Sequence, residues 1–250
     1  MQYMTQWWAL GVSISLFCCF GVAQESTQSG AITLNSIVDA LERTRAGASP
    51  QVSYRLIREY NLSGKNDSSI NSDVVAEVNF RPPANEKYRI QKSSGSHQGQ
   101  QVVQRVLDHE VEVTSNSDQT RIALNRDNYN FALIGEASLD GKPCYRLELK
   151  PKRKEKELIS GELWVDQNSF FVRQIEGDLA KTPSWWLKKV HVKFTFADFD
   201  GSWLQASMEA VADVRIIGPH TLTSHTRDYR GAEKFASSRP RMRAANFGNM

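Results

Sequence analysis

The five histidines are the residues best suited to act as acid–base groups or metal ligands, and they are scattered along the chain. They are His97, His109, His191, His220 and His225. The group Asp108-His109-Glu110, together with Glu112, comes nearest to a ligand cluster. Consecutive residues of a helix point in different directions, however, so a solvated helix face is the favoured interpretation over a metal site.

Catalytic motifs with recognisable spacing are missing from the sequence. The stretch Gly95-Ser96-His97-Gln98-Gly99 has the glycines of a nucleophile elbow, but His97 stands where the nucleophile belongs. The sequence contains no HExxH zinc motif, no Walker loop and no GxGxxG dinucleotide motif. We therefore expect no catalytic residue, no metal site and no cofactor. We also expect that the protein is not an enzyme.

The composition is that of a folded globular protein with a large supply of apolar side chains. Of its 250 residues, 40% are hydrophobic and 24% are charged, and there are six Trp and eleven Phe. The net charge of +3 is too small to favour nucleic acid as a partner, because nucleic-acid binding normally needs a clustered basic face.

The first 23 residues have the pattern of a secretory signal peptide. Trp7 to Val22 carries no charge, and small residues at Gly21-Val22-Ala23 precede the polar Gln24. We expect cleavage after Ala23 and export to the periplasm. The alternative is a retained N-terminal anchor in the envelope, although the apolar run is shorter than the roughly 20 residues that a membrane span needs.

Cysteine usage favours a bacterial envelope protein. Cys18 and Cys19 fall in the signal segment and follow Phe17 and Cys18, respectively, where a lipidation signal needs a small residue. After cleavage only Cys144 remains, which excludes an intramolecular disulfide framework. An exported protein of this size without disulfides must be stabilised by its core, and eukaryotic secreted domains usually have disulfides.

Hydrophobic spacing predicts two helices and a long series of strands. Helical spacing covers residues 33–45 and 99–113, while residues 120–130 are either helical or irregular. Period-two alternation predicts strands near residues 52–56, 74–80, 88–90, 131–135, 145–149, 163–165, 170–175, 190–196, 204–216 and 221–229.

Short turns, such as those at Asp140-Gly141 and Asp200-Gly201, join neighbouring strands, which predicts antiparallel pairing. A mainly β sheet of about ten or eleven strands curls or closes instead of staying flat. We expect one domain over residues 24–234. Residues 235–250, which include Arg239, Arg241 and Arg243, are expected to form a disordered basic tail.

The buried face of such a sheet becomes concave and must be filled by side chains, by the helices or by a ligand. We expect apolar residues of the later strands, together with a tryptophan pair on a loop, to line this concave face. The candidates are Leu163, Val165, Trp185, Trp186, Val192, Phe194, Phe196, Leu204, Met208, Val214 and Ile216.

Two exposed-looking segments have open interpretations. The tract Pro151 to Glu157 is predicted to be a solvated hairpin tip, and the alternative is contact with an anionic membrane surface. Trp185-Trp186 cannot both face one side of a strand, so they either pack in the core, plug the mouth of the sheet or present an apolar rim to lipid.

Several strand and turn segments together resemble the outer-membrane lipoprotein-sorting proteins of the LolA-like superfamily, over roughly residues 32–231. The segments that carry the resemblance are Tyr145 to Lys152, Gly161 to Asp166, Arg173 to Gly177, Pro183 to Trp186, Gly201 to Leu204, Asp228-Tyr229 and Phe80 to Pro83. The resemblance implies a half-open antiparallel β-barrel, covered by two or three helices, whose apolar cavity accepts acyl chains of lipoproteins or other lipids during periplasmic transit.

Two functions from different classes follow. The first is a monomeric periplasmic carrier or binder of lipoprotein acyl chains or lipids, which takes part in sorting lipoproteins to the outer membrane. The second is a non-enzymatic sensor or scaffolding protein of the same fold that binds a protein partner. A hydrolase is a distant third possibility, because it would need a nucleophile that the sequence does not offer.

Overall fold

The structure is a computed structural model that describes residues 32–47, 52–64, 68–115, 119–215 and 218–231. The chain divides into a short unit, residues 1–32, and a main unit, residues 33–250, to which the elements below belong. The predicted signal peptide and the predicted basic tail both lie outside the described residues.

Within the described residues, ten strands form one sheet, and all of the pairs are antiparallel. The strands are β1 (Tyr54–Gly64), β2 (Ser72–Arg81), β3 (Asn85–Gly95), β4 (Tyr129–Leu139), β5 (Lys142–Pro151), β6 (Ile159–Asp166), β7 (Val172–Leu179), β8 (Leu187–Phe199), β9 (Ser202–Val214) and β10 (Gly218–Gly231). The helices are α1 (Leu34–Gly47) and α2 (His97–Ser115), with 3-10 turns η1 (Ser68–Ile70) and η2 (Gln119–Ile122).

The strand order is β3-β2-β1-β10-β9-β8-β7-β6-β5-β4, so the chain builds the sheet from the middle outwards and then from the far edge back. Strands β1 to β3 run to one edge, α2 carries the chain to the other edge, and β10 returns to pair with β1. Among the described strands, β3 and β4 lie at the two edges of the sheet, and each pairs with one neighbour. The curved sheet is therefore open. The predicted fold class is confirmed.

Glycine-containing turns close two of the hairpins. Asp140 and Gly141 have φ of 51° and 75°, and Asp200 and Gly201 have φ of 50° and 86°. Two consecutive positive φ values are the geometry of the tight turn whose twist matches that of antiparallel strands. Both turns were predicted from the sequence, and they fix the registers of β4 with β5 and of β8 with β9.

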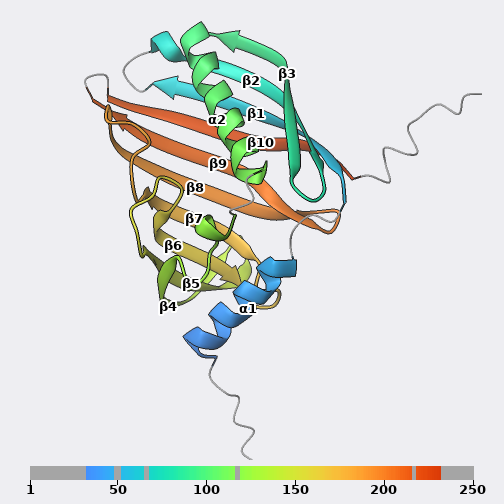
Figure 1. Cartoon of the computed structure of the whole chain (residues 1–250), viewed down its shortest axis with the longest axis vertical. Coiled ribbons are helices and arrows are strands. Elements are labelled where there is room, and N and C mark those ends of the chain that lie inside the picture. The colour runs from blue at the N-terminus through green and yellow to red at the C-terminus, as the bar shows by residue number, and fades with distance from the viewer. Residues whose placement is uncertain (1–31, 48–51, 65–67, 116–118, 216–217, 232–250) are drawn as a thin grey trace, which may run out of the picture. The chain divides into compact units, whose positions relative to one another are not determined.

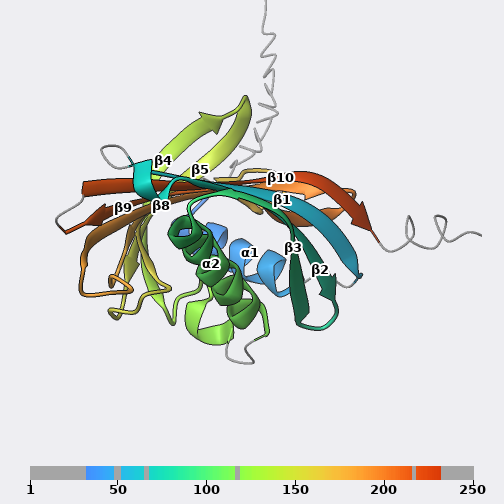
Figure 2. The same cartoon turned by 90° about the horizontal axis from the view of Figure 1, so that it is seen from above.

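Both helices lie on the concave side of the sheet (Figure 2). Helix α1 is capped by Thr33, whose Oγ1 accepts a hydrogen bond from the Ser36 amide at 3.2 Å, and it buries Ile37, Val38 and Leu41. Helix α2 is capped by Ser96, whose Oγ accepts from the Gly99 amide at 3.0 Å. Both helical segments are therefore confirmed.

Helix α2 packs against the β1–β3 end of the sheet, in front of it in Figure 1. Val103 and Leu107 are 0% and 1% exposed and belong to one hydrophobic cluster of the core. The other buried members of that cluster are Tyr60, Leu62, Val74, Ala76, Met208 and Leu222. A second cluster, formed by Tyr54, Leu56, Val78 and Phe80, lies further along the same strands.

The segment between α2 and β4 has little regular structure. It was predicted to be helical or irregular, and it contains the 3-10 turn η2 followed by an irregular stretch up to Tyr129. Among the described residues, no helix combines the length and the apolar character that a membrane crossing requires.

Candidate functional site

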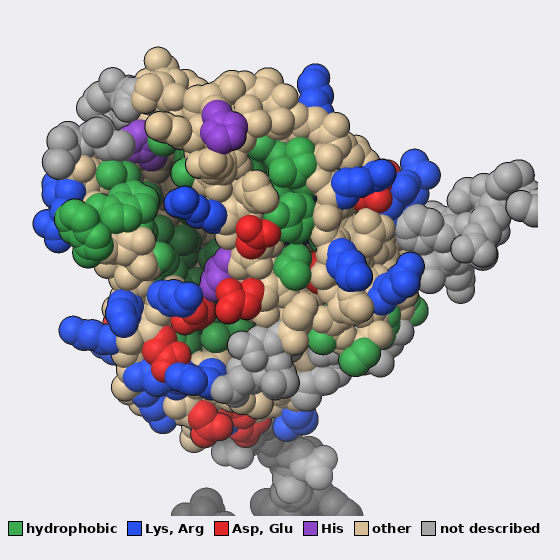
Figure 3. All heavy atoms as spheres, turned by 45° about the horizontal axis from the view of Figure 1, so that its top comes forward, with side chains coloured by type: hydrophobic (Ala, Val, Ile, Leu, Met, Phe, Trp, Pro, Cys, Tyr) green, Lys and Arg blue, Asp and Glu red, His purple; other side chains and the backbone are tan. Residues whose placement is uncertain are grey.

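A cavity of about 430 Å³ lies between α1, the end of α2, the start of β4, residues 119–128, which include η2 and are called the η2 segment below, and strands β6 to β9. This volume falls within the range of about 300–1,000 Å³ that is usual for small-molecule sites. In the space-filling view, hydrophobic side chains gather in a hollow with charged side chains at its rim (Figure 3). The apolar lining residues are Leu41, Val113, Ile122, Leu124, Tyr129, Ile159, Phe170, Phe171, Val172, Ile175, Phe194, Phe196 and Trp203.

Helix α1 forms one wall through residues that share a helix face. Leu41, Thr44 and Arg45 are spaced three and four residues apart and all line the cavity. Two carboxylates on α1 bind Arg126 of the η2 segment, at 2.7 Å from Asp39 and 3.2 Å from Glu42. These ion pairs attach α1 to the neighbouring wall of the cavity.

Aromatic rings form the opposite wall, and polar contacts hold them in place. Phe171 stacks on Trp203 at 4.9 Å between ring centroids, and the Trp203 indole donates a hydrogen bond to the Val172 carbonyl at 2.7 Å. The Arg173 guanidinium also lies over the Trp203 ring, 5.4 Å from its centroid. Large rings with fixed positions make this wall rigid.

The turn before β7 positions these rings. Asp166 accepts hydrogen bonds from the amides of Asn168 and Ser169 and an ion pair from Arg173 at 2.6 Å. Burial alone would raise the pKa of Asp166, but the hydrogen bonds from Ser169, Arg173 and Asn168 lower it to about 2. The carboxylate therefore stays ionised at neutral pH and fixes the turn that carries Phe170, which has φ of 57°.

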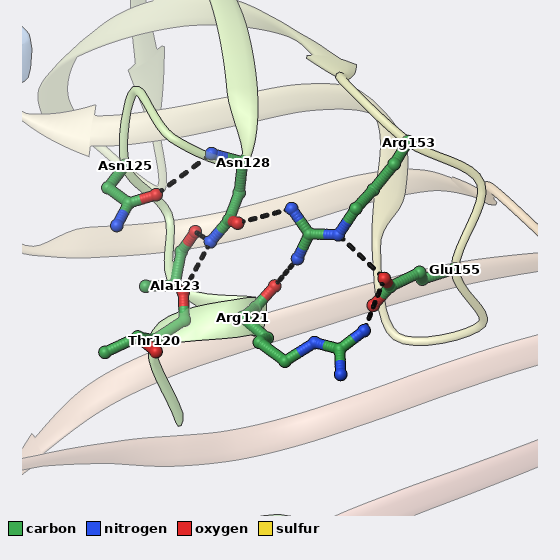
Figure 4. A network of polar contacts seen from close by, with 7 residues as sticks. All are labelled: Thr120, Arg121, Ala123, Asn125, Asn128, Arg153 and Glu155. Atoms are coloured by element: carbon green, nitrogen blue, oxygen red, sulfur yellow. Dashed lines mark hydrogen bonds and ion pairs between the residues drawn. The ribbon is translucent and has the colours of Figure 1, made fainter. Parts of the chain in front are cut away.

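A polar network joins the residues around η2 to the segment that follows β5 (Figure 4). The buried Asn128 amide donates to the carbonyls of Thr120 and Ala123, both at 2.7 Å, and its oxygen accepts from Arg153 at 2.7 Å. Arg153 also donates to Glu155, at 2.8 Å, and to the Arg121 carbonyl. This network joins the segment that carries Ile122 and Leu124 to the segment that leads to Glu157.

The network revises the interpretation of the charged tract Pro151 to Glu157. It was predicted to be a solvated hairpin tip, but Arg153 and Glu155 turn inwards to bind the η2 segment, while Lys154 and Lys156 are exposed. The tract therefore supports a cavity wall, which is a role that its charge pattern alone does not indicate.

Polar groups are few in the cavity wall. They are Thr44, Arg45, Glu157, Gln205 and the hydroxyl of Tyr129. Glu157 lies 3.5 Å from Lys156. The surrounding apolar groups desolvate the Arg45 guanidinium and lower its pKa, although the side chain as a whole is exposed. An apolar cavity with one cation in its wall suits an amphiphile better than a sugar or a nucleotide.

Of the residues predicted to line a cavity, the structure brings only Phe194 and Phe196 to this one. Leu163, Val165, Val192 and Met208 are buried elsewhere in the core, and Leu204 packs on the Tyr54 cluster. Val214 is half-buried at the end of β9, and Ile216 lies outside the described residues. Trp185 and Trp186 are 84% and 41% exposed on the β7–β8 loop, so they are not packed in the core.

Two lining residues of β9, Trp203 and Gln205, were missed because the alternation along this strand is interrupted. Thr195 pairs with Ser207, and Phe196 pairs with Gln205, which leaves Ala206 as the extra residue of a β-bulge. Trp203 and Gln205 thereby line the cavity, whereas simple alternation from Met208 puts Leu204 on that face. The aromatic run Phe170-Phe171 and the tryptophan at 203 were the available sequence signals.

The acidic and imidazole group on α2 is structural within the described residues. Glu110 accepts from Arg58 at 2.8 Å and from the Tyr60 hydroxyl at 2.9 Å, and Asp108 accepts from the Tyr88 hydroxyl. Asp108 is exposed, as a solvated face predicts, although it accepts this hydrogen bond. The expectation is wrong for Glu110, which is half-buried and binds the sheet. Across the part of the chain that the structure describes, no three potential metal ligands gather in one place.

Comparison with known proteins finds likeness at the level of the fold. The chain is similar to a putative outer membrane lipoprotein-sorting protein domain from Vibrio parahaemolyticus, with 12% identity and a TM-score of 0.45, over 78% of this chain and 92% of the other. It is also similar to a LolA superfamily protein from Nitrosomonas europaea, with 12% identity and a TM-score of 0.42, over 80% and 94% of the two chains. The similar structures thus include the family that the sequence resembles.

A third similar structure is a DUF1329 family protein from Desulfovibrio piger, with 14% identity and a TM-score of 0.41, over 79% and 92% of the two chains. A family model described as "Uncharacterized protein" matches residues 109–216, which include most of the cavity wall. The search of curated proteins finds no match.

Proposed function

We propose that the protein binds acyl chains of lipids or lipoproteins in the cavity and carries them through the periplasm, in the sorting of lipoproteins to the outer membrane. The observation that carries this proposal is an open cavity of about 430 Å³ with an almost wholly apolar, largely aromatic wall. Each methylene that an acyl chain buries there contributes about 0.8 kcal/mol, so binding needs no specific hydrogen bond.

The first test is direct detection of lipid. Native mass spectrometry of the mature protein, purified from a bacterial envelope, should find acyl-bearing ligand at close to one per chain. The same sample gives the N-terminal residue and the oligomeric state, which we expect to be Gln24 and a monomer. Lipid binding would be refuted if the protein carried a different ligand at one per chain and no acyl-bearing mass.

A matched pair of variants locates the binding site. Phe196→Glu places a carboxylate in the cavity wall, whereas Leu133→Glu places one at an exposed apolar position on the edge strand β4. After delipidation, Phe196→Glu should lose binding of a fluorescent long-chain fatty acid, and Leu133→Glu should retain it. Equal retention by two folded variants would place the ligand outside this cavity.

The sorting role needs a cellular measurement. Deleting the gene should shift at least some outer-membrane lipoproteins to the inner-membrane fraction, and expression of the Phe196→Glu protein should fail to reverse the shift. If lipoproteins keep their distribution while the purified protein still binds lipid, the protein carries another lipid and sorting is excluded.

Partner binding is the second candidate function, and the exposed tryptophan pair favours it. Arg215 holds the Trp185-Trp186 loop in place, because its Nε donates to the Trp185 carbonyl and its amide donates to the Trp186 carbonyl, both at 2.9 Å. Exposed tryptophans on a fixed loop are typical of contact surfaces. Replacing both with Ser should abolish recovery of a stoichiometric protein partner; retained recovery would rule out this surface.

A further inference from the structure

Arg45 is a cation without an ion-pair partner among the described residues, in a mostly apolar cavity wall. No hydrogen bond or ion pair joins its guanidinium to any other residue that the structure describes. Two other arginines of this region are already engaged, since Arg126 binds Asp39 and Glu42 and Arg153 binds Asn128 and Glu155. A guanidinium that an apolar wall partly desolvates, and that has no counter-charge, gains from a ligand that supplies one.

Tyr129 places a second donor in the same wall. The side chain is 3% exposed, and its hydroxyl oxygen accepts a hydrogen bond from the Ile159 amide at 3.2 Å. No described acceptor takes the hydroxyl proton of Tyr129, and the guanidinium of Arg45 is close enough to interact electrostatically with this phenol. A cation and a hydroxyl donor therefore share one wall of the cavity.

Glu157 is the one carboxylate in the cavity wall, and its charge has a partner. Its Oε1 lies 3.5 Å from the ammonium group of Lys156, and no ion pair links it to Arg45 among the described residues. The remaining polar lining groups, Thr44 and Gln205, are neutral. The charge that is left without a partner in the cavity is therefore positive.

We infer that the ligand of this cavity is an acidic amphiphile whose anionic head group binds the Arg45 guanidinium and the Tyr129 hydroxyl while its acyl chain fills the apolar space. The inference rests on the proposed lipid binding and narrows it from acyl chains in general to amphiphiles with a carboxylate or a phosphate. The exposed position of Arg45 keeps the head group at the mouth, and the aromatic wall receives the chain.

The test measures the affinity of the delipidated mature protein for three ligands. They are a long-chain fatty acid, its methyl ester and a monoacyl phosphate of equal chain length. The acid and the phosphate should each bind at least about tenfold more tightly than the ester, because a charge-assisted hydrogen bond in a desolvated wall is worth roughly that factor. A preference between acid and phosphate identifies which head group the site takes.

Arg45→Gln should remove the preference, because it should lower the affinity for the acid about tenfold and leave the affinity for the ester unchanged. Arg43→Gln is the matched control, since Arg43 is an exposed arginine on the same helix that does not line the cavity. Tyr129→Phe should reduce the acid-to-ester ratio by a smaller factor. Because this ratio is taken within one variant, a general loss of stability does not change it.

The outcomes separate the two proposals. Equal binding of acid and ester by the natural protein, or an unchanged ratio in Arg45→Gln, overturns the acidic head group and leaves acyl-chain binding intact. Failure of all three ligands to bind overturns the proposed function itself. Glu157→Gln should tighten binding of the acid by removing a nearby negative charge, and weaker binding of the acid by this variant would contradict the placement of an anionic head group beside Arg45.

Discussion

The concave face of the sheet has a filled half and an open half. Under α2, the β1–β3 end of the face is packed with apolar side chains, and Val103 and Leu107 are almost completely buried. Under α1 and η2, the β6–β9 end retains a cavity of about 430 Å³. Phe194 marks the boundary, since it packs against the filled half and also lines the cavity.

The two halves are stabilised differently, which explains why one of them stays open. In the filled half, apolar side chains of α2 interdigitate with the sheet, and close packing leaves little space. In the open half, ion pairs and hydrogen bonds at the rim hold the walls, through Arg126 with α1 and through Arg153 with Asn128. Rim contacts fix the distance between the walls without filling the space between them.

The largest effect is expected from replacing two leucines, Leu107 and Leu41, which are each 1% exposed. Leu107→Ala in the filled half should lower the free energy of unfolding by about 3–5 kcal/mol, because it creates a new cavity. Leu41→Ala should cost only about 1–3 kcal/mol, since that side chain already borders empty space. Urea denaturation of the delipidated proteins measures both. Equal losses would mean that the two halves are packed alike.

The second effect is a pH dependence confined to the filled half. Burial, and then the negative charge of Glu110, raise the pKa of Glu86 to about 7, while a hydrogen bond with Thr114 opposes the shift. The folded protein therefore holds this proton between pH 4.5 and about 7, where the unfolded chain releases it. Stability contributed by the protonated form is complete below the lower pH and is lost as pH rises through about 7.

Denaturation at pH 5 and pH 8 tests this prediction. The free energy of unfolding should fall by roughly 1–3 kcal/mol between the two values, after correction with the Glu86→Gln protein. The variant should lack this component because its amide does not titrate. Glu136→Gln on the exposed part of β4 is a control. The same pH dependence in the natural and Glu86→Gln proteins would contradict the assignment.

The third effect concerns the rim of the open half. Asn128→Ala removes two hydrogen bonds to the carbonyls of Thr120 and Ala123 and one from Arg153 (Figure 4). We expect a loss of about 1–2 kcal/mol, because the freed groups regain water as the loop relaxes. Lipid binding should weaken as well, since Ile122 and Leu124 lose their support. Hydrogen exchange of residues 119–128 measures the loosening, and unchanged protection would show that the network does not hold this wall.

The sequence predicted the filled half well because its determinants are local. The helical spacing of Val103 and Leu107 and the alternation in β1 and β2 are visible in the sequence, and both patterns point to the same buried face. The Asp-Gly turns set the strand registers by local backbone geometry. Fold class, strand count and both helices followed from such signals.

The open half depends on contacts between residues that are distant in the sequence. The bulge at Ala206 changes which side chains of β9 face inwards, and no local pattern in the sequence indicates this bulge. Likewise, Arg153 reaches Asn128, 25 positions earlier, and thereby turns a charged tract into the support of a cavity wall. The predicted concave lining therefore included Phe194 and Phe196 but not Trp203 or Leu124.

The smallest change in stability is expected for Val113→Phe. Its comparison with Val103→Phe distinguishes the halves most sharply, because both valines belong to α2. Val103 is fully buried in the filled half, and Val113 is half-buried and lines the cavity. Val103→Phe should cost about 1–3 kcal/mol, since the packed cluster has no room for a ring. Val113→Phe should change the free energy of unfolding by less than about 0.5 kcal/mol, because the ring enters empty space.

The same pair of variants links the empty space to the ligand. Val113→Phe should reduce the amount of long-chain fatty acid bound at saturation and favour shorter chains, because the ring occupies part of the volume that an acyl chain needs. Val103→Phe should leave the preferred chain length unchanged in the fraction that remains folded. If Val113→Phe were as destabilising as Val103→Phe, the wall at α2 would be closed, and the distinction between a filled and an open half would fail.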